Sequence, residues 1–110
     1  MKELTVLEQM VLVSILNLEQ DAYGVAIRKR ISSLTRKNLM YGTLYNALDQ
    51  MYRKGLIQKS KKEPAGTSRG LHGRVYYTLT GTGKKALRSA YKLQKSMWAS
   101  VPDLTQDGEL

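Results

Sequence analysis

The chain contains no cysteine and a single histidine, His72. The lack of cysteine excludes disulfide bonds and cysteine-ligated zinc sites, and an intracellular, reducing compartment is the expected setting. A metal site needs several ligands, so a single histidine in a segment rich in glycine and arginine does not predict a metal site. We expect His72 to be solvated or to contact a phosphate group.

Long apolar runs are also missing. The most apolar stretch, Met10–Leu18, is too short to span a bilayer and contains Ser14 and Asn17. Glu3 and Glu8 do not fit the positively charged start of a secretion signal. We therefore expect a cytoplasmic, unprocessed protein that makes no membrane contact.

Acidic residues are few, with 9 Asp and Glu against 18 Lys and Arg in 110 residues, a net charge of +9 and a pI near 9.9. The length predicts one domain, and the charge predicts a polyanionic partner. The cations form three segments: Arg28, Lys29, Arg30, Arg36 and Lys37; then Arg53, Lys54, Lys59, Lys61, Lys62, Arg69 and Arg74; then Lys84, Lys85, Arg88, Lys92 and Lys95. A nucleic-acid backbone explains all three. An anionic membrane is less suited, because these segments lack the apolar face of an interfacial helix.

No catalytic pattern is present. Gly81–Lys85 resembles a phosphate-binding loop, but Thr78 occupies the position of its first glycine and Lys85 that of its Ser or Thr. A carboxylate pair and a nucleophile–histidine set are both lacking. We expect no catalytic residues, no metal and no cofactor.

The segment Tyr41–Ile57 has the pattern of a helix with one buried edge. Its apolar residues recur at helical spacing, and they are Leu44, Ala47, Leu48 and Met51. The opposite side is small or hydrogen-bonding near its start, and it carries Gly42, Thr43, Asn46, Asp49, Gln50 and Arg53. This pattern favours a DNA recognition helix. An ordinary surface helix is the alternative that this segment alone leaves open.

Two further helices are predicted before it. Thr5 and Glu8 match a capping box and predict a helix over Val6–Leu18. Its apolar residues cover more than one face, so either the domain body or another subunit must cover the second face. A second helix is expected over Tyr23–Leu34, with an inner stripe of Tyr23, Ile27, Ile31 and Leu34. The segment 32–38 then connects to the recognition helix, which gives the order of a helix-turn-helix unit.

A hairpin is predicted to follow Gly55, a glycine suited to a helix end with positive φ. The expected strands are Leu56–Ser60 and Val75–Leu79, joined by a glycine-rich tip over Glu63–Gly73. A basic hairpin after a recognition helix is the wing of a winged-helix domain. We expect Arg69, His72 and Arg74 to reach a neighbouring groove or its phosphates.

A last helix is expected from Thr80 or Thr82, as N-cap, to about Ser100, closed by Pro102. It extends beyond what the domain needs. Its seam consists of Leu87, Ala90, Tyr91, Gln94, Met97, Trp98 and Val101. This spacing favours pairing with the first helix of another subunit, and packing within one subunit is the alternative. We expect the acidic tail after Pro102 to be disordered.

The motifs Asp21–Arg28, Gly42–Leu48, Lys54–Ile57 and Gly73–Thr80, together with Gly83, resemble the PadR family of transcriptional regulators. The resemblance covers about residues 4 to 92 and is closest to the small subgroup with a single C-terminal helix. It implies a homodimeric winged-helix repressor that binds a pseudo-palindromic operator. Met40 and Tyr41 depart from the small polar residue and proline that often begin the family's recognition helix, so we expect a weaker helix cap.

The predicted fold class is therefore α+β and mostly α, with a winged helix-turn-helix DNA-binding domain over 1–80, a dimerisation helix over 81–101 and a tail over 102–110. The expected DNA contacts are Tyr23, Arg28, Lys37, Tyr41, Gly42, Thr43, Tyr45, Asn46, Arg53, Arg69, His72 and Arg74. The expected dimer contacts are Met10, Val13, Leu87, Tyr91, Met97 and Trp98.

The predicted function is a dimeric, sequence-specific transcriptional regulator of duplex DNA, most simply a repressor. A winged-helix module that binds protein or RNA without operator specificity is the alternative. Trp98 is also a candidate ligand-binding residue for a small hydrophobic or aromatic effector, and a packing anchor for the dimer is the competing interpretation. Both a ligand-responsive and a constitutive regulator fit the sequence.

Overall fold

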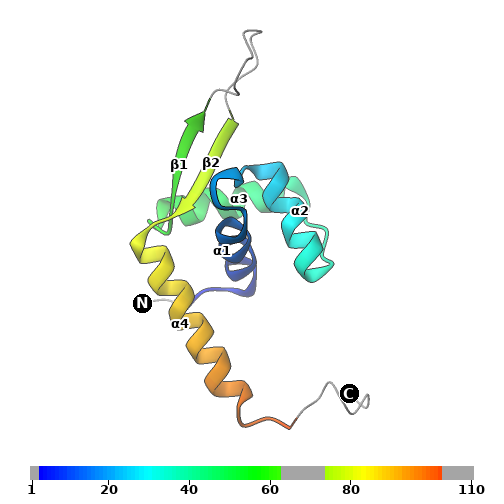
Figure 1. The fold of residues 1–110 in the computed structure, drawn as a ribbon, viewed down its shortest axis with the longest axis vertical. Helices are drawn as coiled ribbons and strands as arrows, with labels where there is room; N and C mark the ends of the chain where they lie inside the picture. Colours follow the sequence, from blue (N-terminus) through cyan, green and yellow to red (C-terminus); the bar gives the residue numbers. More distant parts are fainter. Residues whose placement is uncertain (1–2, 63–73, 103–110) are drawn as a thin grey trace.

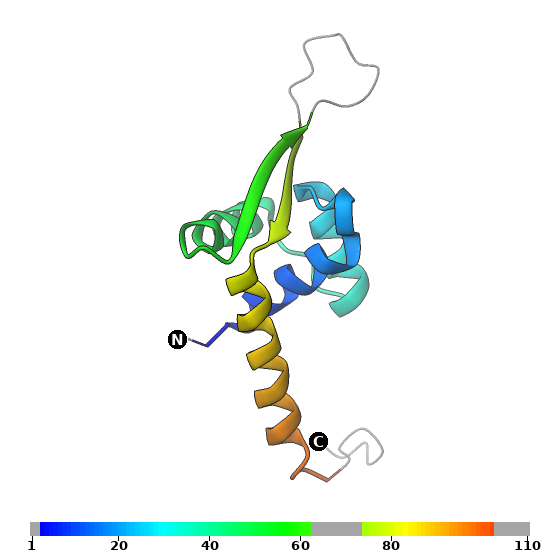
Figure 2. The same ribbon diagram turned by 60° about the vertical axis from the view of Figure 1, so that its left-hand side comes forward.

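The computed structural model describes residues 3–62 and 74–102, and within them the chain forms four α-helices and one two-stranded sheet. The order is α1 (Val6–Leu18), a 3-10 turn η1 (Glu19–Asp21), α2 (Gly24–Thr35), α3 (Tyr41–Arg53), β1 (Ile57–Lys62), β2 (Arg74–Leu79) and α4 (Gly81–Trp98). Helices α1, α2 and α3 pack together at the base of the hairpin, and α4 projects from this body (Figures 1 and 2). This arrangement confirms the predicted winged-helix fold.

Helix α1 begins with the expected capping box. The Glu8 amide donates to Thr5 Oγ1 over 3.1 Å, and the Thr5 amide donates to Glu8 Oε1 over 2.9 Å. Val11, Leu12 and Ile15 are buried, whereas the side chain of Leu16 is exposed. The fold of one chain therefore covers only part of the apolar surface of α1. None of the described helices has the length and apolar character of a membrane span.

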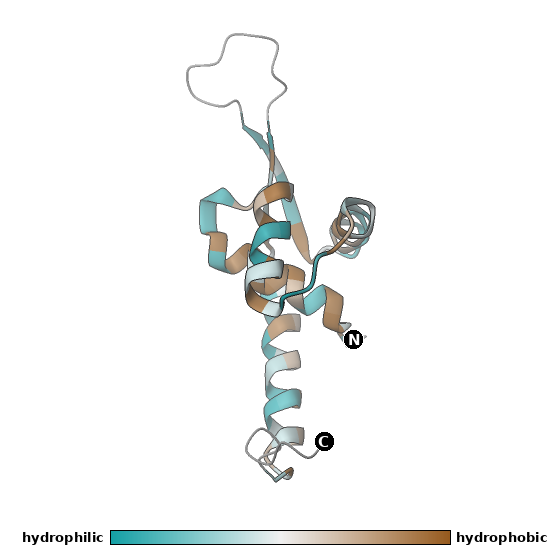
Figure 3. Ribbon diagram, turned by 90° about the vertical axis from the view of Figure 1, so that its right-hand side faces the viewer, coloured by the Kyte–Doolittle hydropathy of each residue, from teal (hydrophilic) through white to brown (hydrophobic). Residues whose placement is uncertain are grey.

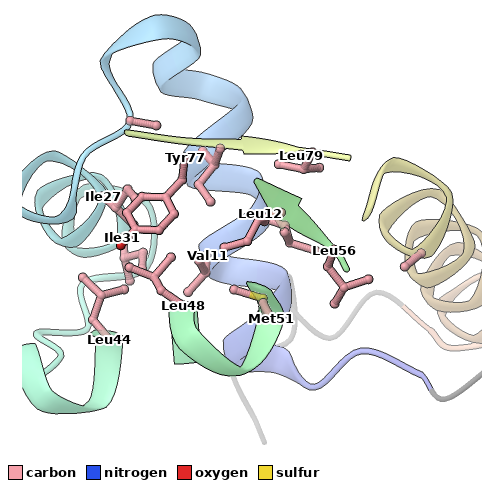
Figure 4. Packing of buried hydrophobic residues seen from close by; sticks show 14 residues of the cluster. Val11, Leu12, Ile27, Ile31, Leu44, Leu48, Met51, Leu56, Tyr77 and Leu79 are labelled. Atoms are coloured by element: carbon pink, nitrogen blue, oxygen red, sulfur yellow. The ribbon is translucent and has the colours of Figure 1, made fainter. Parts of the chain in front are cut away.

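The hydrophobic core lies where the first three helices meet the sheet (Figure 4). Its members include Val11, Leu12, Ile27, Ile31, Leu44, Leu48, Met51, Ile57, Tyr77 and Leu79. The predicted apolar stripe of α3 is confirmed, because Leu44, Ala47, Leu48 and Met51 are all buried. Leu34 differs from the prediction and is 45% exposed. It lies in the last turn of α2, beyond Ile31, the last buried residue of this helix.

The two strands pair antiparallel, from Ile57 opposite Leu79 to Lys62 opposite Arg74. The first strand begins one residue later than predicted and continues to Lys62. Gly55 has φ of +77°, as expected for a glycine that ends the turn after α3. The predicted tip, 63–73, lies outside the described residues.

The start of α2 is attached to the second strand. Tyr23 and Tyr76 form an isolated antiparallel bridge, and the Tyr77 amide donates to the Ala22 carbonyl over 2.9 Å. The prediction placed Tyr23 inside the second helix, but it is the N-cap of α2 and has extended backbone. These hydrogen bonds explain the difference, because a residue paired with a strand cannot be helical.

Helix α4 begins against the turn that follows α3. Thr80 is its N-cap, and the Gly83 amide donates to Thr80 Oγ1 over 3.0 Å. Gly83 is buried, and a Cβ atom at this position would lie 2.0 Å from the Leu56 carbonyl oxygen. A glycine is therefore needed for the close approach of α4 to the sheet. Figure 3 shows the apolar residues concentrated in the body, with polar and apolar residues alternating along α4.

Gly83→Ala should lower the free energy of unfolding by about 1–3 kcal/mol, the usual cost of an extra group in a filled site. The backbone carbonyl of Leu56 cannot move aside without displacing the sheet. Gly81→Ala is the matched control, because a Cβ there would meet nothing within 4 Å. Urea denaturation checks both variants, and equal stability of the two would contradict the close approach.

Candidate nucleic-acid interface

Helix α3 exposes the face opposite its buried stripe. Tyr41, Gly42, Thr43, Tyr45 and Asn46 are all exposed, and they occupy the first half of the helix. The N-cap, Met40, makes no side-chain hydrogen bond to the helix start, which confirms the weaker cap. The N-terminal amides of α3 thus lie beside small or hydrogen-bonding side chains at the surface, as a helix that enters a DNA groove requires.

Arg28 connects α2 to the start of α3. Its guanidinium lies 4.8 Å from the centre of the Tyr41 ring, and its Nε donates to the Leu39 carbonyl. The rings of Tyr41 and Tyr45 stack with centroids 6.2 Å apart. Arg28 uses one of its five N–H donors in this contact, so its remaining donors stay suited to a phosphate.

Tyr45 is held over the N-terminus of α2. A Cβ atom at Gly24 would lie 1.9 Å from the Tyr45 hydroxyl oxygen, so the ring packs directly on the glycine backbone. Sequence reasoning used Gly24 as part of a motif but assigned it no role. The two residues are separated by 21 positions, and only the folded chain shows that one leaves space for the other.

A second cluster lies where the start of α2 meets β2, toward the Lys62–Arg74 end of the sheet. The rings of Tyr23 and Tyr76 meet edge to face with centroids 5.7 Å apart. Arg74 lies 4.3 Å from the centre of the Tyr23 ring, and Lys62 lies 5.2 Å from that of Tyr76. The structure therefore brings together the predicted residues Tyr23 and Arg74. Lys62 and Tyr76 were not predicted as site residues, although alternation of cations and aromatics in the two strands could have indicated them.

The C-terminal half of α3 carries further charge. Arg53 and Asp49 form an ion pair of 3.1 Å, with the Arg53 side chain 76% exposed. Lys59 lies 4.3 Å from the centre of the Tyr52 ring. Lys37 is exposed in the connection after α2. Arg69 and His72 lie outside the described residues.

The described surface is rich in Lys and Arg side chains and contains no cluster of side chains that could bind a metal ion. Asp49 is the only acidic residue in the sequence between Asp21 and Glu63. Within residues 3–62 and 74–102, no cluster of three or more His, Asp or Glu side chains could hold a metal ion. Arginines and lysines at a surface are side chains that commonly contact a phosphate backbone.

Comparisons with known proteins agree with this geometry. The model of the transcriptional regulator PadR-like family matches residues 11–89. The chain belongs to the PadR-like family. Members are transcriptional regulators that bind DNA, so the protein is a DNA-binding regulator and not an enzyme.

Solved structures of other proteins share the fold. A PadR family regulator from Clostridium difficile R20291 is 30% identical, with 84% of this chain and 86% of that chain covered and a TM-score of 0.60. RosR from H. salinarum is 26% identical, with 93% and 84% covered and a TM-score of 0.67. A PadR-like regulator from Bacillus cereus is 24% identical, covers 92% of each chain with a TM-score of 0.73, and supports the fold alone. A search of curated proteins gave no significant match.

The PadR-like chain has a second exposed surface on α1 and α4. A groove of about 560 Å³ runs between these helices, and its lining is Gln9, Val13, Leu16, Lys84, Leu87, Arg88, Tyr91 and Gln94. Gln94 donates to Gln9 across it. Three of the predicted dimer residues, Val13, Leu87 and Tyr91, meet here. Trp98 does not line this groove.

The remaining predicted dimer residues are divided between the body and the projecting end of α4. Met10 is half-buried against the core. Met97 and Trp98 are 52% and 61% exposed. One chain does not bring Trp98 against α1, so the expected contact between Trp98 and the first helix would need a second subunit.

Gly42→Ala should separate stability from DNA binding. A Cβ atom at Gly42 meets nothing within 4 Å, so alanine should raise the free energy of unfolding by about 0.5–1 kcal/mol through its higher helix propensity. The same methyl group should weaken DNA binding, because it projects from the exposed face of α3. Thermal melts and fluorescence anisotropy measure the two effects. Gly81→Ala is the control, and a Gly42→Ala protein that binds DNA as tightly as wild type would exclude close contact at this position.

Proposed function

We propose that the protein is a homodimeric, sequence-specific repressor in which the exposed start of α3 enters the major groove. The observation that carries this proposal is the surface formed by Gly42, Thr43 and Asn46, which we call the reading face. Asn and Thr side chains can hydrogen-bond to base edges, and a glycine allows close approach of the helix. The buried stripe on the opposite side fixes which face is presented.

Phosphate contacts are proposed for the cations around the reading face. Arg28 and Lys37 lie before α3, Arg53 lies at its end, and Arg74 begins the second strand. Their positions on separate elements suit a protein that follows the two backbones flanking a groove. Tyr23, Tyr41 and Tyr45 support these cations or hydrogen-bond to phosphate through their hydroxyl groups. Arg69 and His72, which lie outside the described residues, complete the proposed set from their sequence alone.

Dimerisation is proposed through α4 and α1. Tyr91, Met97 and Trp98 are each more than half exposed, and Val6 on α1 is 66% exposed. Large apolar side chains gathered on one helix indicate a partner surface. The division into a DNA-binding domain over 1–80 and a dimerisation helix over 81–101 follows from this assignment. A symmetric dimer would hold two copies of α3 about 34 Å apart, one turn of DNA.

Effector sensing is a second candidate function. Four of the eight residues that line the groove between α1 and α4 are Val13, Leu16, Leu87 and Tyr91, and their apolar surface would suit a planar hydrophobic molecule. A ligand that favoured one packing of the two helices would change operator affinity by its differential affinity for the two states. Trp98 would contact such a ligand only from a second subunit, and otherwise it serves as a packing anchor.

Selection of bound fragments from a random duplex pool tests the function. We expect recovery of an inverted repeat whose half-sites are centred about one DNA turn apart, with affinity that falls steeply as salt increases. A winged-helix module for protein or RNA would recover no preferred duplex, and an affinity independent of salt would exclude phosphate contacts.

Two variants then separate base recognition from phosphate binding on the selected duplex. Asn46→Ala should change which base is preferred at one position of each half-site. Arg74→Ala should weaken binding to all duplexes and reduce the salt slope by about one unit per lost phosphate contact. If both variants weaken every duplex equally, α3 is not the element that reads sequence.

Tyr91→Glu should convert the proposed dimer to monomer, because a carboxylate would be buried in an apolar interface. Light scattering measures the mass. Lys92→Glu, at the neighbouring exposed position of α4, is the control and should remain dimeric. A Tyr91→Glu protein with unchanged dimer mass would place the interface elsewhere.

A further inference from the structure

The C-terminal end of α3 is held from two sides. On one side, Lys54 Nζ donates to Glu8 Oε2 on α1 over 2.8 Å. On the other side, Thr80 Oγ1 at the start of α4 donates to the Gly55 carbonyl over 2.6 Å, and the Thr80 amide donates to the Leu56 carbonyl over 3.0 Å. We call this set, Glu8, Lys54, Gly55 and Thr80, the α3 clasp.

Glu8 is an unusual residue in this core because it is a carboxylate that is only 7% exposed. Both of its oxygens have a donor, since Oε1 accepts from the Thr5 amide and Oε2 from Lys54. Burial by itself would raise the pKa of Glu8, but the hydrogen bonds from Lys54 and Thr5 and the charge of Lys54 outweigh it and lower the pKa. The carboxylate is therefore charged at neutral pH, and removing its cationic partner would leave a buried charge uncompensated.

Thr80 has a similar double role. Its hydroxyl donates to Gly55 and accepts from the Gly83 amide, so one side chain joins the end of α3 to the first turn of α4. The close packing of Gly83 on the Leu56 carbonyl reinforces this connection. The segment 54–56 is consequently fastened to α1 and to α4, the two helices that line the groove.

We propose that Glu8 and Thr80 are positioning residues for DNA binding, which fix the direction in which α3 presents the reading face. The inference rests on the proposed role of α3 in reading sequence. The clasp couples α3 to the packing of α1 against α4, so a shift between these two helices is transmitted to the recognition helix. Neither residue needs to contact DNA for specific binding to depend on it.

Simple geometry gives the sensitivity of this arrangement. Thirteen helical residues span about 20 Å at 1.5 Å per residue, so the clasp lies about that far from the start of α3. A tilt of about 5° at the clasp would displace the first turn by about 1.7 Å, more than half the length of a hydrogen bond. Core contacts from Leu44, Leu48 and Met51 hold the helix against the body, and the clasp fixes its far end.

Glu8→Gln is the sharpest test. Glutamine keeps the capping box, because its amide oxygen can still accept from the Thr5 amide, but it removes the ion pair with Lys54. The substitution also removes one negative charge, and electrostatics alone would then strengthen binding to every duplex. The clasp instead predicts a loss of specificity. The ratio of the affinity for the selected duplex to that for a mixed-sequence duplex of equal length should fall by about five- to tenfold. This is the effect expected when part of the free energy of a charged hydrogen bond is lost.

Matched variants separate positioning from stability. Thr5→Ala removes the cap at the same helix end without touching Lys54, so it should lower the melting temperature and leave the affinity ratio unchanged. Thr80→Val should lower the ratio, whereas Thr80→Ser retains the hydroxyl and should preserve it. This pair also tests the clasp if Glu8→Gln does not fold. All affinities are measured at a temperature where melting curves show the variants folded.

The outcomes are distinct. The positioning role would be overturned if the affinity ratio were unchanged in both Glu8→Gln and Thr80→Val, or if Thr5→Ala lowered the ratio as much as they do. The proposed operator binding of the wild-type protein would still stand. A wild-type protein that selects no duplex sequence would overturn the proposed function and the clasp together. A reduced ratio in Glu8→Gln and Thr80→Val, with Thr5→Ala and Thr80→Ser unaffected, is the expected result.

Discussion

Burial of one edge of α3 is the constraint on which the rest of the structure depends. Leu44, Leu48 and Met51 are almost completely buried among residues of α1, α2 and the sheet. Each such side chain contributes about 1.5–3 kcal/mol when removed from water, so rotating α3 about its axis would cost several kcal/mol. The reading face is exposed because exposing the opposite, apolar face to water would be unfavourable. The buried edge of α3 and the face that we propose for DNA recognition are thus two consequences of one helical period.

Pairing of cations with aromatic rings organises the surface around this helix. Arg28 with Tyr41, Arg74 with Tyr23, Lys59 with Tyr52 and Lys62 with Tyr76 are such pairs. At exposed sites each pair contributes about 0.5–1 kcal/mol, too little to determine the fold. Each ring restricts the long side chain of its cation, and if these cations contact DNA as proposed, less conformational entropy is lost on binding. A flexible lysine-rich surface would attract DNA without this ordering.

The surfaces proposed for DNA binding and for dimerisation are connected through α3. The start of α3 faces outward for DNA, while its end is attached to α1 and α4. Helix α4 packs on the body through Ala86 and Ala90 and leaves Tyr91, Met97 and Trp98 exposed. Small residues on one side and large apolar residues on the other suit a helix that contacts its own domain and a second subunit.

The sequence by itself determined the features that depend on local chemistry. The capping box of Thr5 and Glu8 set the start of α1, the apolar period set the buried edge of α3, and Gly55 set the turn with positive φ. Four motifs in order were sufficient to indicate the PadR family. The cap, the apolar period and the turn each depend on residues that are only a few positions apart, so they can be recognised in the amino-acid sequence.

Tertiary structure decided the contacts between distant residues. Lys54 lies 46 positions from Glu8, yet it neutralises that carboxylate, and Tyr45 packs on Gly24 of another helix. Periodicity predicted Leu34 to be buried, but it lies beyond Ile31, the last buried residue of α2, and is exposed. The sequence specifies which side chains can form such contacts, but the crossing of helices and strands determines which of them come within reach.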